Sequence, residues 1–473
     1  MNRKSIAVIG LGLLGTSLAR ALYGHPDYRV LAWARRQETR CWARENRIAD
    51  CVFDTLPEIL SACDLVVLCL PVESAITMLP VCAEYLPPHA VVTDIGSVKG
   101  AICRAAASYP ALRFVGSHPM AGTEKSGCEA AFAALYRNAD VFVVPPENGD
   151  PEDVELCRKL WLDAGAARVE QISAEAHDEL VADTSHVLHI LASAMSLSIL
   201  EAATPDGQRR HFAGCATGFR DTTRIASSNP VMWREIVESN SQAVLAALDR
   251  FEERYRQFRS TIESGDFDRF ESLFARGRLL RNAWLGYKRP RPARLLICGI
   301  KHCGKSSTGK ALAQLLGVNF IDSDEQMLEV WKTGHPESEI STIRELYRSV
   351  GEEQFRKLEA DVLEALSATS YAMVLTPGGG ALSNPFVSGT VLKKLGCIVW
   401  IDVPDQVAWQ RIAAGGIPPF LAGSADPEAE FIRANGERRK QFEALADLKI
   451  TPGKDDSPRD NALHILELLE NIN

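Results

Sequence analysis

The chain has 473 residues, enough for about three folding units of ordinary size. Hydrophobic residues make up 46% of it and charged residues 24%, a balance that is typical of a globular protein and excludes a disordered or collagen-like chain. Its 52 Lys and Arg residues against 61 Asp and Glu residues give a net charge of −9, which argues against a protein that coats nucleic acid.

The twelve cysteines are scattered between Cys41 and Cys397 without any Cys-x-x-Cys pair. In a chain long enough to bury a full core, this distribution predicts reduced thiols and a cytoplasmic location. The N-terminal apolar run stops at a glycine-rich turn and no small-residue cleavage site follows, so we expect no signal peptide. No run of about 18 apolar residues occurs, so we also expect no membrane span.

Short apolar runs alternate with helical stretches through residues 1–145. The runs are Ile6–Ile9, Val30–Trp33, Leu65–Leu70, Ala90–Thr93 and Val141–Val144. Runs of this length, bounded by Gly, Pro or Asp, predict an α/β fold with a parallel sheet that helices cover on both faces.

A glycine-rich loop follows the first of these runs. Gly10-Leu-Gly12-Leu-Leu-Gly15 stands between a predicted strand and the helix Thr16–Leu22. This spacing allows a tight turn, a close approach of the backbone to a pyrophosphate and packing of the helix on the strand. We therefore predict a doubly wound Rossmann domain at residues 1–150 that binds a dinucleotide.

The end of the second predicted strand indicates which dinucleotide. An acidic residue expected there would bind the adenosine ribose diol of NAD, but the sequence has Arg35 and Arg36 and no carboxylate. Two guanidinium groups suit a 2′-phosphate, so we predict NADP, with NAD as the alternative.

The pattern becomes almost wholly helical from about Glu152 to Leu285. Ala174–Glu201 has an apolar period of 3.6 residues, and Met232–Phe274 has charges on one face. We predict an all-α domain at residues 151–286. A basic, proline-containing linker at 287–293 ends it, and a second α/β domain follows at 294–473.

The second α/β domain opens with another phosphate-binding pattern. Gly299, Gly304, Lys305 and Ser306 satisfy the spacing G-x-x-x-x-G-K-[ST], with Ser307 following, after a predicted strand and before a helix. Backbone N–H groups of such a loop hold phosphates, the lysine reaches the outer phosphates and the hydroxyl binds Mg²⁺. We predict that this domain binds ATP and Mg²⁺.

Four motifs in the first 285 residues resemble those of the prephenate/arogenate dehydrogenase family. They are Asp94-Ile-Gly-Ser97-Val-Lys99, Gly116-Ser-His118-Pro-Met-Ala-Gly122-Thr-Glu124-Lys-Ser-Gly127, Ser185-His186-Val-Leu-His189 and Gly218-Phe-Arg-Asp-Thr-Thr-Arg224-Ile-Ala, with Met232-Trp233. The resemblance implies oxidative decarboxylation of prephenate or arogenate by a Rossmann domain and a helical domain that forms a homodimer.

The resemblance also assigns roles to single residues. His118 takes the substrate hydroxyl proton, for which its near-neutral pKa is suitable. Ser97 hydrogen-bonds this imidazole or the hydroxyl, and Arg224 and His189 contact substrate carboxylates. Glu124 and Trp233 belong to the substrate pocket. Leu188 stands where the family often has Pro, which leaves the helix before His189 unkinked. His186 and His189 are one helical turn apart, but no third ligand suggests a metal.

Residues 294–455 resemble shikimate kinase. The matching segments are Asp322-Ser-Asp324, Gln354-Phe-Arg356-Lys-Leu-Glu359, Gly378-Gly379-Gly380 and Arg438-Arg-Lys-Gln-Phe442. By this resemblance Asp322 supports Mg²⁺ together with Ser306, and Asp324 orients the acceptor hydroxyl and is its candidate base. Arg356 and Arg438 hold the shikimate carboxylate, and Gly378–Gly380 close on its ring.

Two departures from the kinase pattern leave the activity of this half open. His302 replaces a loop glycine, and Pro418 replaces the lid arginine that contacts phosphate; Arg411, matched to the other lid arginine, is expected on the adenine. Losing such a cation costs on the order of 10³-fold in rate, by analogy with arginine fingers. The alternatives are therefore an active shikimate kinase, for which Lys301 is a candidate substitute cation, a catalytically weak or regulatory nucleotide-binding module, and a kinase for another small hydroxy acid.

Overall fold

The structure is a computed structural model that describes residues 3–123, 125–201, 204–288, 292–415, 424 and 426–470. The chain forms two compact units, Met1–Gln257 and Phe258–Asn473. The division lies inside one helix, α12 (Ser241–Ser264), and each unit contains its own sheet.

An eight-stranded sheet is the centre of the first unit, with the strand order β3-β2-β1-β4-β5-β6-β7-β8. The strands are β1 (Lys4–Ile9), β2 (Tyr28–Trp33), β3 (Cys51–Val52), β4 (Leu65–Leu68), β5 (Val91–Asp94), β6 (Arg113–Pro119), β7 (Asp140–Val144) and β8 (Arg168–Gln171). Its helices are α1 (Leu13–Leu22), α2 (Gln37–Glu45), α3 (Leu56–Ser61), α4 (Val72–Tyr85), α5 (Gly100–Ala107) and α6 (Pro151–Asp163).

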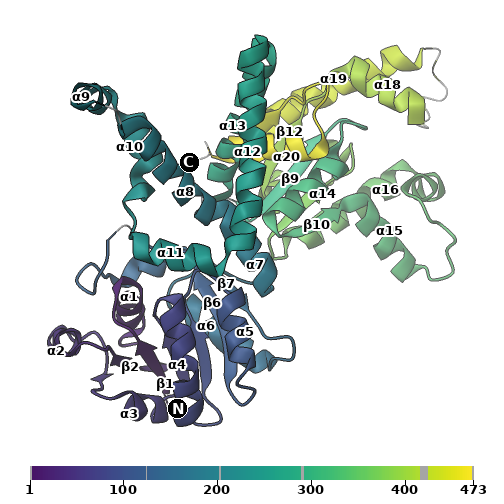
Figure 1. Cartoon of the computed structure of the whole chain (residues 1–473). Helices are drawn as coiled ribbons and strands as arrows, with labels where there is room; N and C mark the ends of the chain where they lie inside the picture. The colour runs from purple at the N-terminus through teal and green to yellow at the C-terminus, as the bar shows by residue number, and fades with distance from the viewer. Residues whose placement is uncertain are drawn as a thin grey trace. The chain divides into compact units, whose positions relative to one another are not determined.

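Both faces of this sheet are buried, as the sequence predicts for a doubly wound fold. Along β1, Ile6 and Val8 join the core beneath α1 and α6, whereas Ala7 and Ile9 join the core beneath α3, α4 and α5. Alternate residues of a strand point to opposite faces, so one strand supplies two hydrophobic cores. Figure 1 shows these helices around the strands.

Part of the sheet differs from the parallel sheet that the apolar runs predict. β7 pairs antiparallel with β6, and β8, which pairs parallel with β7, lies in a region expected to be helical. β8 is short and mostly exposed, so it has no apolar run to reveal it. The sheet therefore continues past the expected division at residue 150.

The remaining elements of the first unit are helical. They are α7 (Ala174–Val181), α8 (Val187–Leu200), α9 (Pro205–Gly214), α10 (Thr217–Thr223), α11 (Pro230–Ser239) and the first part of α12. A π-helical turn, Ala182–His186, joins α7 to α8, where the sequence predicts regular helix. A π turn holds one residue more than a regular turn, and such turns are frequent at functional sites.

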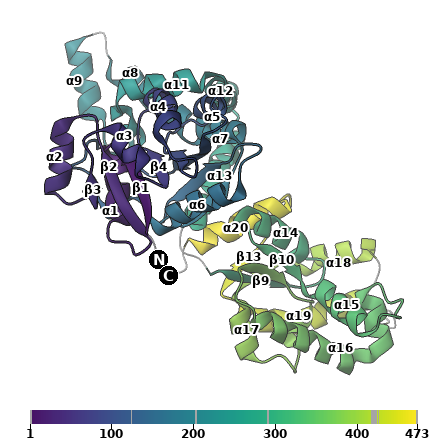
Figure 2. The ribbon, with the colours of Figure 1, turned by 90° about the horizontal axis from the view of Figure 1, so that it is seen from below.

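The second unit contains a five-stranded, wholly parallel sheet in the order β10-β11-β9-β12-β13. Its strands are β9 (Arg294–Gly299), β10 (Asn319–Asp322), β11 (Met373–Thr376), β12 (Cys397–Ile401) and β13 (Leu448–Ile450). The helices after β9 are α14 (Lys305–Leu316), α15 (Ser323–Gly334), α16 (Ile343–Ser367), α17 (Gly389–Leu395), α18 (Asp405–Gly415), α19 (Pro427–Leu445) and α20 (Pro458–Leu469). Figure 2 shows α14 and α20 on one side of this sheet and α17 and α19 on the other.

Helix α13 (Phe267–Lys288) precedes the expected linker, yet it packs on α20 within the second unit. Leu279 and Ala283 of α13 are buried in the same hydrophobic core as Leu463 and Leu466 of α20. A Cβ atom on Gly286 would collide with the carbonyl oxygen of Leu466, so the two backbones meet at this glycine. Asn282 Nδ2 donates to Glu467 Oε1 at 3.0 Å beside this contact.

Candidate active sites

The first glycine loop connects β1 to α1 and has the shape of a phosphate cradle. Gly10 has φ +103°, and a Cβ atom there would collide with the carbonyl oxygen of Cys69, so only glycine fits. A Cβ atom on Gly12 would meet nothing within 4 Å, which leaves the backbone open to a pyrophosphate. Gly15 lies in the first turn of α1 and packs closely against the loop. These features fit a bound dinucleotide.

Arg35 and Arg36 follow β2 and are both exposed, at the start of α2. A carboxylate in this neighbourhood, Asp54, is bound to Arg40 at 3.1 Å and to Arg44 at 2.8 Å. These two ion pairs hold the pKa of Asp54 below its ordinary value, chiefly through the hydrogen bonds that Arg44 and Arg40 donate. The end of β2 is thus positively charged, with its nearby carboxylate already neutralised.

His118 lies at the end of β6, opposite Phe142 of β7, and is half-buried. Its Nδ1 is 2.9 Å from Nε2 of His177, and Nδ1 of His177 is 2.9 Å from Oδ1 of Asp178. Burial lowers the pKa of His118 well below its ordinary value, and the neighbouring His177 and Lys99 lower it further. His118 is therefore neutral at pH 7 and can accept a proton.

A buried ion pair supports the strand that carries His118. Lys99 Nζ binds the carboxylate of Asp94 and also donates to the carbonyl oxygen of Ser117 at 2.9 Å. Asp94 in turn accepts a hydrogen bond from Ser117 N at 3.2 Å. Both side chains are almost fully buried, so removal of either would leave an uncompensated charge.

The π turn and α8 bring two histidines to a tryptophan of α11. The His189 ring stacks on Trp233 with ring centroids 3.9 Å apart, and the His186 ring meets the same Trp233 edge-on at 5.8 Å. Burial lowers the pKa of His189; its hydrogen bond to the Ser185 carbonyl acts in the opposite direction, and the positive charge of Arg224 lowers it again. His189, Trp233 and Arg224 thus form one cluster, in which Arg224 is exposed.

Two predicted residues of this half, Ser97 and Glu124, have roles that the described contacts do not test. Ser97 lies half-buried between β5 and α5, while the described hydrogen bond of the His118 ring goes to His177. Glu124 lies outside the described residues. Their predicted roles remain predictions.

The second glycine loop connects β9 to α14. Gly304 has φ +93° and precedes the helix, and Lys305 Nζ donates to the carbonyl oxygens of Gly299 and Ile300 at 3.2 and 3.3 Å. His302, which replaces a loop glycine, has φ +63°. The loop therefore keeps the left-handed geometry at this residue despite the side chain, which histidine tolerates better than most residues.

Carboxylates and hydroxyls converge beside this loop. Ser306 Oγ donates to Asp322 Oδ2 at 2.8 Å, and Thr376 Oγ1 donates to the same oxygen at 3.1 Å. Burial and the neighbouring Asp322 raise the pKa of Asp324, while Lys305 and Lys301 oppose that shift. A hydroxyl and a carboxylate at the end of the phosphate loop fit Mg²⁺, which prefers oxygen ligands and keeps several waters.

The glycine segment after β11 lies over the second aspartate. Gly378 N donates to Ser323 Oγ at 3.0 Å, and a Cβ atom on Gly378 would lie 3.0 Å from Asp324 Oδ1 and 2.7 Å from Glu359 Oε1. Gly379 faces the phosphate loop, since a Cβ atom on it would have Lys301 N as its nearest neighbour at 3.9 Å, and Gly380 precedes the short helical turn Ala381–Ser383. Burial raises the pKa of Glu359 to about 7.

The two arginines expected on a substrate carboxylate lie near each other. Burial lowers the pKa of Arg438, and the charge of Arg356 lowers it further. Arg356 itself donates to Glu352, one helical turn earlier, at 2.7 Å. A substrate carboxylate would have to compete with that exposed ion pair, which is weak in water.

Arg411, one of the two expected lid positions, lies on α18 and donates to the carbonyl oxygen of His302 at 3.2 Å. This hydrogen bond ties α18 to the phosphate loop. Pro418 lies outside the described residues. Within the described part of the chain, no group of three or more His, Cys, Asp or Glu side chains has the arrangement of a metal site.

Comparison with known proteins assigns these sites to families. Residues 18–170 match the model "Prephenate dehydrogenase, nucleotide-binding domain", residues 173–276 match "Prephenate dehydrogenase, dimerization domain", and residues 301–470 match "Shikimate kinase". The cyclohexadienyl dehydrogenase of Zymomonas mobilis is 34% identical over 269 residues, which cover 56% of this chain and 90% of that protein. The shikimate kinase of a Synechococcus species is 33% identical over 179 residues, 38% of this chain and 83% of that protein.

The chain belongs to the prephenate dehydrogenase and shikimate kinase families. It is a bifunctional enzyme of aromatic biosynthesis. The solved structure of prephenate dehydrogenase from A. aeolicus, in complex with hydroxyphenyl propionate and NAD⁺, agrees with the dehydrogenase part. It has a TM-score of 0.55 and 29% identity, and the match covers 59% of this chain and 98% of that one.

The motifs of the two families did not lead us to three residues near these sites. His177 and Asp178 of α7 are adjacent in sequence, and no motif marks them, but the fold places them behind His118 of the dehydrogenase. Asn240, at the end of α11, donates to the carbonyl oxygen of Asp178 at 2.8 Å. The feature of the sequence that could have revealed His177 and Asp178 is that these two polar residues lie on the apolar side of a predicted helix.

Proposed function

We propose that the dehydrogenase converts prephenate to hydroxyphenylpyruvate, with arogenate as the alternative substrate. The observation that carries this proposal is a neutral His118 that is linked to the His189, Trp233 and Arg224 cluster through His186, whose charge acts on His118 and whose ring meets Trp233. The two substrates differ by a keto group against an ammonium group on the side chain. Glu124, the candidate partner of an ammonium, suits either enzyme, so assays with both substrates decide between them.

The reaction makes simple demands on the chain. The ring carbon that bears the hydroxyl loses a hydride, the opposite ring carbon loses carbon dioxide, and the ring becomes aromatic. When bound, the nicotinamide ring accepts the hydride. His118 takes the hydroxyl proton as the carbonyl forms and returns it to the phenolate oxygen, so no net proton is released. Arg224 and His189 hold substrate carboxylates, and Trp233 forms a wall of the pocket.

Replacing His118 by Asn tests this role. We expect near-complete loss of hydride transfer with both cyclohexadienols, because amide nitrogen cannot accept the hydroxyl proton, while cofactor binding stays unchanged. Nicotinamide reduction is followed at saturating substrate, and cofactor binding by fluorescence quenching. Activity of His118→Asn within tenfold of the unchanged chain would contradict the proposal.

We infer that the kinase unit transfers a phosphoryl group from ATP to shikimate. Three features support this proposal. They are the phosphate loop, Asp324, which has a raised pKa and lies beside Gly378, and the neighbouring guanidinium groups of Arg356 and Arg438. ATP supplies the phosphoryl group and Mg²⁺, held by Ser306 and Asp322, neutralises its charge. Asp324 accepts the hydroxyl proton of the acceptor, Lys305 contacts the outer phosphates and Arg411 contacts the adenine.

The alternative to an active kinase is a nucleotide-binding module that turns over slowly, since Pro418 replaces a phosphate-contacting arginine. Shikimate-dependent release of ADP by the full chain decides between them, with Lys305→Met as the inactive control. We expect turnover that requires shikimate and Mg²⁺. ATP binding without turnover favours the module, and faster turnover with a gluconate-type acceptor favours a different kinase.

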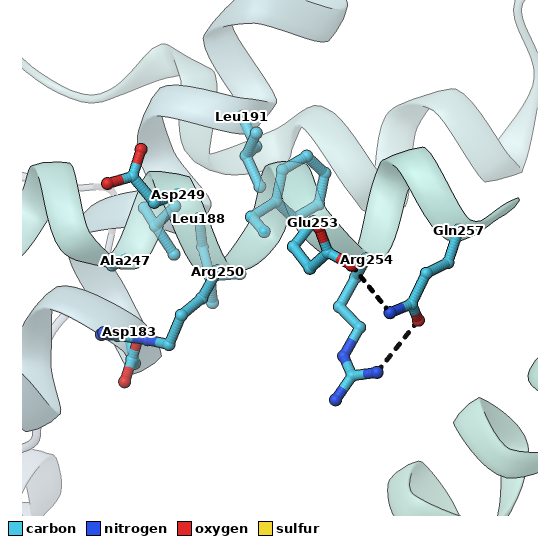
Figure 3. Close-up of a pocket in the computed structure, with 11 residues that line it drawn as sticks. Asp183, Leu188, Leu191, Ala247, Asp249, Arg250, Glu253, Arg254 and Gln257 are labelled. Atoms are coloured by element: carbon cyan, nitrogen blue, oxygen red, sulfur yellow. Dashed lines mark hydrogen bonds and ion pairs between the residues drawn. The ribbon is translucent and has the colours of Figure 1, made fainter. Parts of the chain in front are cut away.

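We propose that the dehydrogenase forms a homodimer through its helical part. One described stretch, Ala174–Leu200, is long and apolar enough to span a membrane by length and composition, but only 28% of its most apolar window is buried. Leu188 and Leu197 of this stretch are 46% and 62% exposed. Beside it, α8 and α12 line a pocket of about 730 Å³ with an apolar floor, including Leu191 and Ala247 (Figure 3).

A charged pair lies at the edge of this pocket, where Arg250 binds Asp183 at 2.7 Å. An apolar floor with a charged rim is typical of a surface that a second protein subunit covers. A double change of Leu188 and Leu197 to Glu should convert a dimer to a monomer in analytical ultracentrifugation. A sedimentation coefficient that stays that of the unchanged chain would contradict this assignment.

We propose that the enzyme works in the cytoplasm without nucleic-acid or membrane partners. The net charge of −9 and the free state of all twelve cysteines support this proposal. Separation of cell extract into soluble and membrane fractions tests it.

A further inference from the structure

A chain of hydrogen bonds runs from the proposed base to the first turn of α5. His118 Nδ1 is 2.9 Å from His177 Nε2, and His177 Nδ1 is 2.9 Å from Asp178 Oδ1. Asp178 Oδ1 also accepts from Lys99 N at 2.7 Å, and its Oδ2 accepts from Gly100 N at 2.8 Å. His177 is fully buried and Asp178 is 8% exposed, so water does not compete for these bonds.

Asp178 is ionised in this setting. Burial alone would raise its pKa, but the hydrogen bonds from His177 and from the backbone of Lys99 and Gly100 outweigh burial and lower it. The two backbone donors stand at the N-terminus of α5, where the helix dipole favours a negative charge. An ionised carboxylate only accepts hydrogen bonds, so His177 must carry its proton on Nδ1.

The tautomer of His177 then fixes that of His118. Burial lowers the pKa of His177, so its ring is neutral and Nε2 is an acceptor. The hydrogen bond between the rings therefore runs from the His118 Nδ1–H to His177 Nε2. This leaves Nε2 of His118 with a free lone pair.

We propose that His177 and Asp178 are positioning residues of the dehydrogenase, which hold His118 as the Nδ1–H tautomer with Nε2 ready to accept the hydroxyl proton. The proposal deepens the role proposed for His118 and rests on it. After proton uptake at Nε2, the imidazolium keeps its Nδ1–H bond to His177, and Asp178 faces the new charge through that ring.

Other groups near His118 do not replace this pair. Lys99 is bound to Asp94 and Ser117, and His186 of the π turn accepts a hydrogen bond from Asn240 Nδ2 at 3.3 Å through its own Nδ1. Burial lowers the pKa of His186 to about 4. The direct hydrogen-bond partner of the His118 ring in the described residues is His177.

The first test replaces Asp178 by Asn in the full chain. The Asn amide can donate to His177 Nδ1, which reverses the two hydrogen bonds and puts the His118 proton on Nε2. In another His–Asp pair the same change lowers kcat about 10⁴-fold through the wrong tautomer. With one ring more between the carboxylate and the base, we expect a fall in kcat of about 100-fold or more, with the KM for cofactor unchanged and no recovery at higher pH.

A matched pair at His177 separates positioning from packing. His177→Gln places an amide where Nε2 lies and can accept from His118 Nδ1–H, so kcat should stay within tenfold of the unchanged enzyme. His177→Asn places its amide where Nδ1 lies and cannot reach His118, so kcat should fall with Asp178→Asn. A packing role would make the fall in kcat of each variant follow its loss of stability in urea unfolding, whereas a positioning role lowers the kcat of His177→Asn in the fraction that stays folded. Asp153→Asn, which removes a buried carboxylate that pairs with Arg113, is the control for stability alone.

A spectroscopic measurement decides the question even if these variants do not fold. In the full chain labelled with ¹⁵N-histidine, the His118 resonances, assigned by their loss in His118→Asn, should show a protonated Nδ1 and an unprotonated Nε2. An Nε2–H tautomer, or a kcat for Asp178→Asn within threefold of the unchanged enzyme, would overturn the proposal. Failure of the unchanged chain to oxidise either cyclohexadienol would instead refute the proposed function, since the tautomer is measured without substrate.

Discussion

At the scale of single residues, the local charge decides how strongly each site can hold a phosphate group. Arg35 and Arg36 supply two exposed guanidinium groups after β2, while Asp54 nearby is neutralised by Arg40 and Arg44. The second site lacks a positive charge instead, because Pro418 stands where the resemblance to shikimate kinase predicts an arginine. Both situations can be tested by removing charge.

Changing Arg35 and Arg36 together to Ser should lower kcat/KM for NADP about 10²- to 10⁴-fold, because each of the two charge-assisted hydrogen bonds to a phosphate is worth about 1.5–3 kcal/mol. The kcat/KM for NAD should change by less than threefold. Arg29→Ser, which removes an exposed arginine from β2 itself, is the matched control. A clear preference of the unchanged enzyme for NAD would refute the prediction.

Lys301 is the candidate substitute for the lid arginine that Pro418 replaces. It lies in the phosphate loop, where burial and the charge of Arg344 lower its pKa and the charge of Asp324 raises it. If Lys301 stabilises the transferred phosphoryl group, Lys301→Met should lower the kinase kcat about 10²- to 10³-fold and leave ATP affinity nearly unchanged. Lys357→Met, on the exposed face of α16, serves as the control. Equal kcat values for both variants would exclude this role.

At the scale of elements, the helix–helix contact at Gly286 offers a sharp test of packing. Gly286→Leu forces α13 away from α20 and should destabilise the second unit by about 1–3 kcal/mol or more. Gly277, on the same helix, has nothing within 4 Å of its built Cβ atom, so Gly277→Leu should leave stability unchanged or raise it by up to about 1 kcal/mol. Urea unfolding followed by tryptophan fluorescence measures both. Equal midpoints would mean that α13 does not pack on α20.

In the first unit, the apolar runs predicted the strands that are rich in Val, Leu and Ile and missed β3, β6 and β8, which contain fewer of these residues. β1, β2, β4, β5 and β7 were all expected from Val, Leu and Ile. β6 carries His118 in the segment Arg-Phe-Val-Gly-Ser-His-Pro, where function has replaced apolar residues, and β8 has a single apolar residue.

The candidate sites were predictable where a motif fixes both spacing and chemistry. The two glycine loops and the Asp322–Asp324 pair lie where their spacing requires. His177 and Asp178 could not be found in this way, because their role depends on α7 packing against β6 and α5, a contact between segments far apart in sequence. The π turn was not predicted either, because it shifts the apolar pattern by a single residue, which a period of 3.6 residues does not resolve over so short a stretch.

At the scale of the whole molecule, helix α13 lies before the segment that matches the shikimate kinase family but packs on that segment. The shikimate kinase match begins at residue 301, but the compact unit begins at Phe258 and includes α13. The buried residues Leu463, Leu466 and Leu469 of α20 share a core with Leu279 and Ala283 of α13. The kinase therefore depends on a helix that its family does not define.

A fragment of residues 258–473 should accordingly fold and bind ATP, whereas a fragment of residues 294–473 should be less stable or aggregate. Each large core side chain that loses its cover costs about 1.5–3 kcal/mol. Thermal unfolding and ATP binding by calorimetry compare the two fragments. Identical melting temperatures would show that α13 is dispensable.

The π turn at Ala182–His186 has a genetic consequence. Because it holds one residue more than a regular turn, an in-frame deletion of one codon, such as that for Thr184, restores an ordinary helix. Because the wide turn absorbs the extra residue, the part of α8 that follows would keep its phase, and the imidazole of His189 would stay stacked on Trp233. A one-residue deletion within α8 itself would instead turn the residues after it by about 100°, so this helix can lose a residue at the π turn but not beyond it.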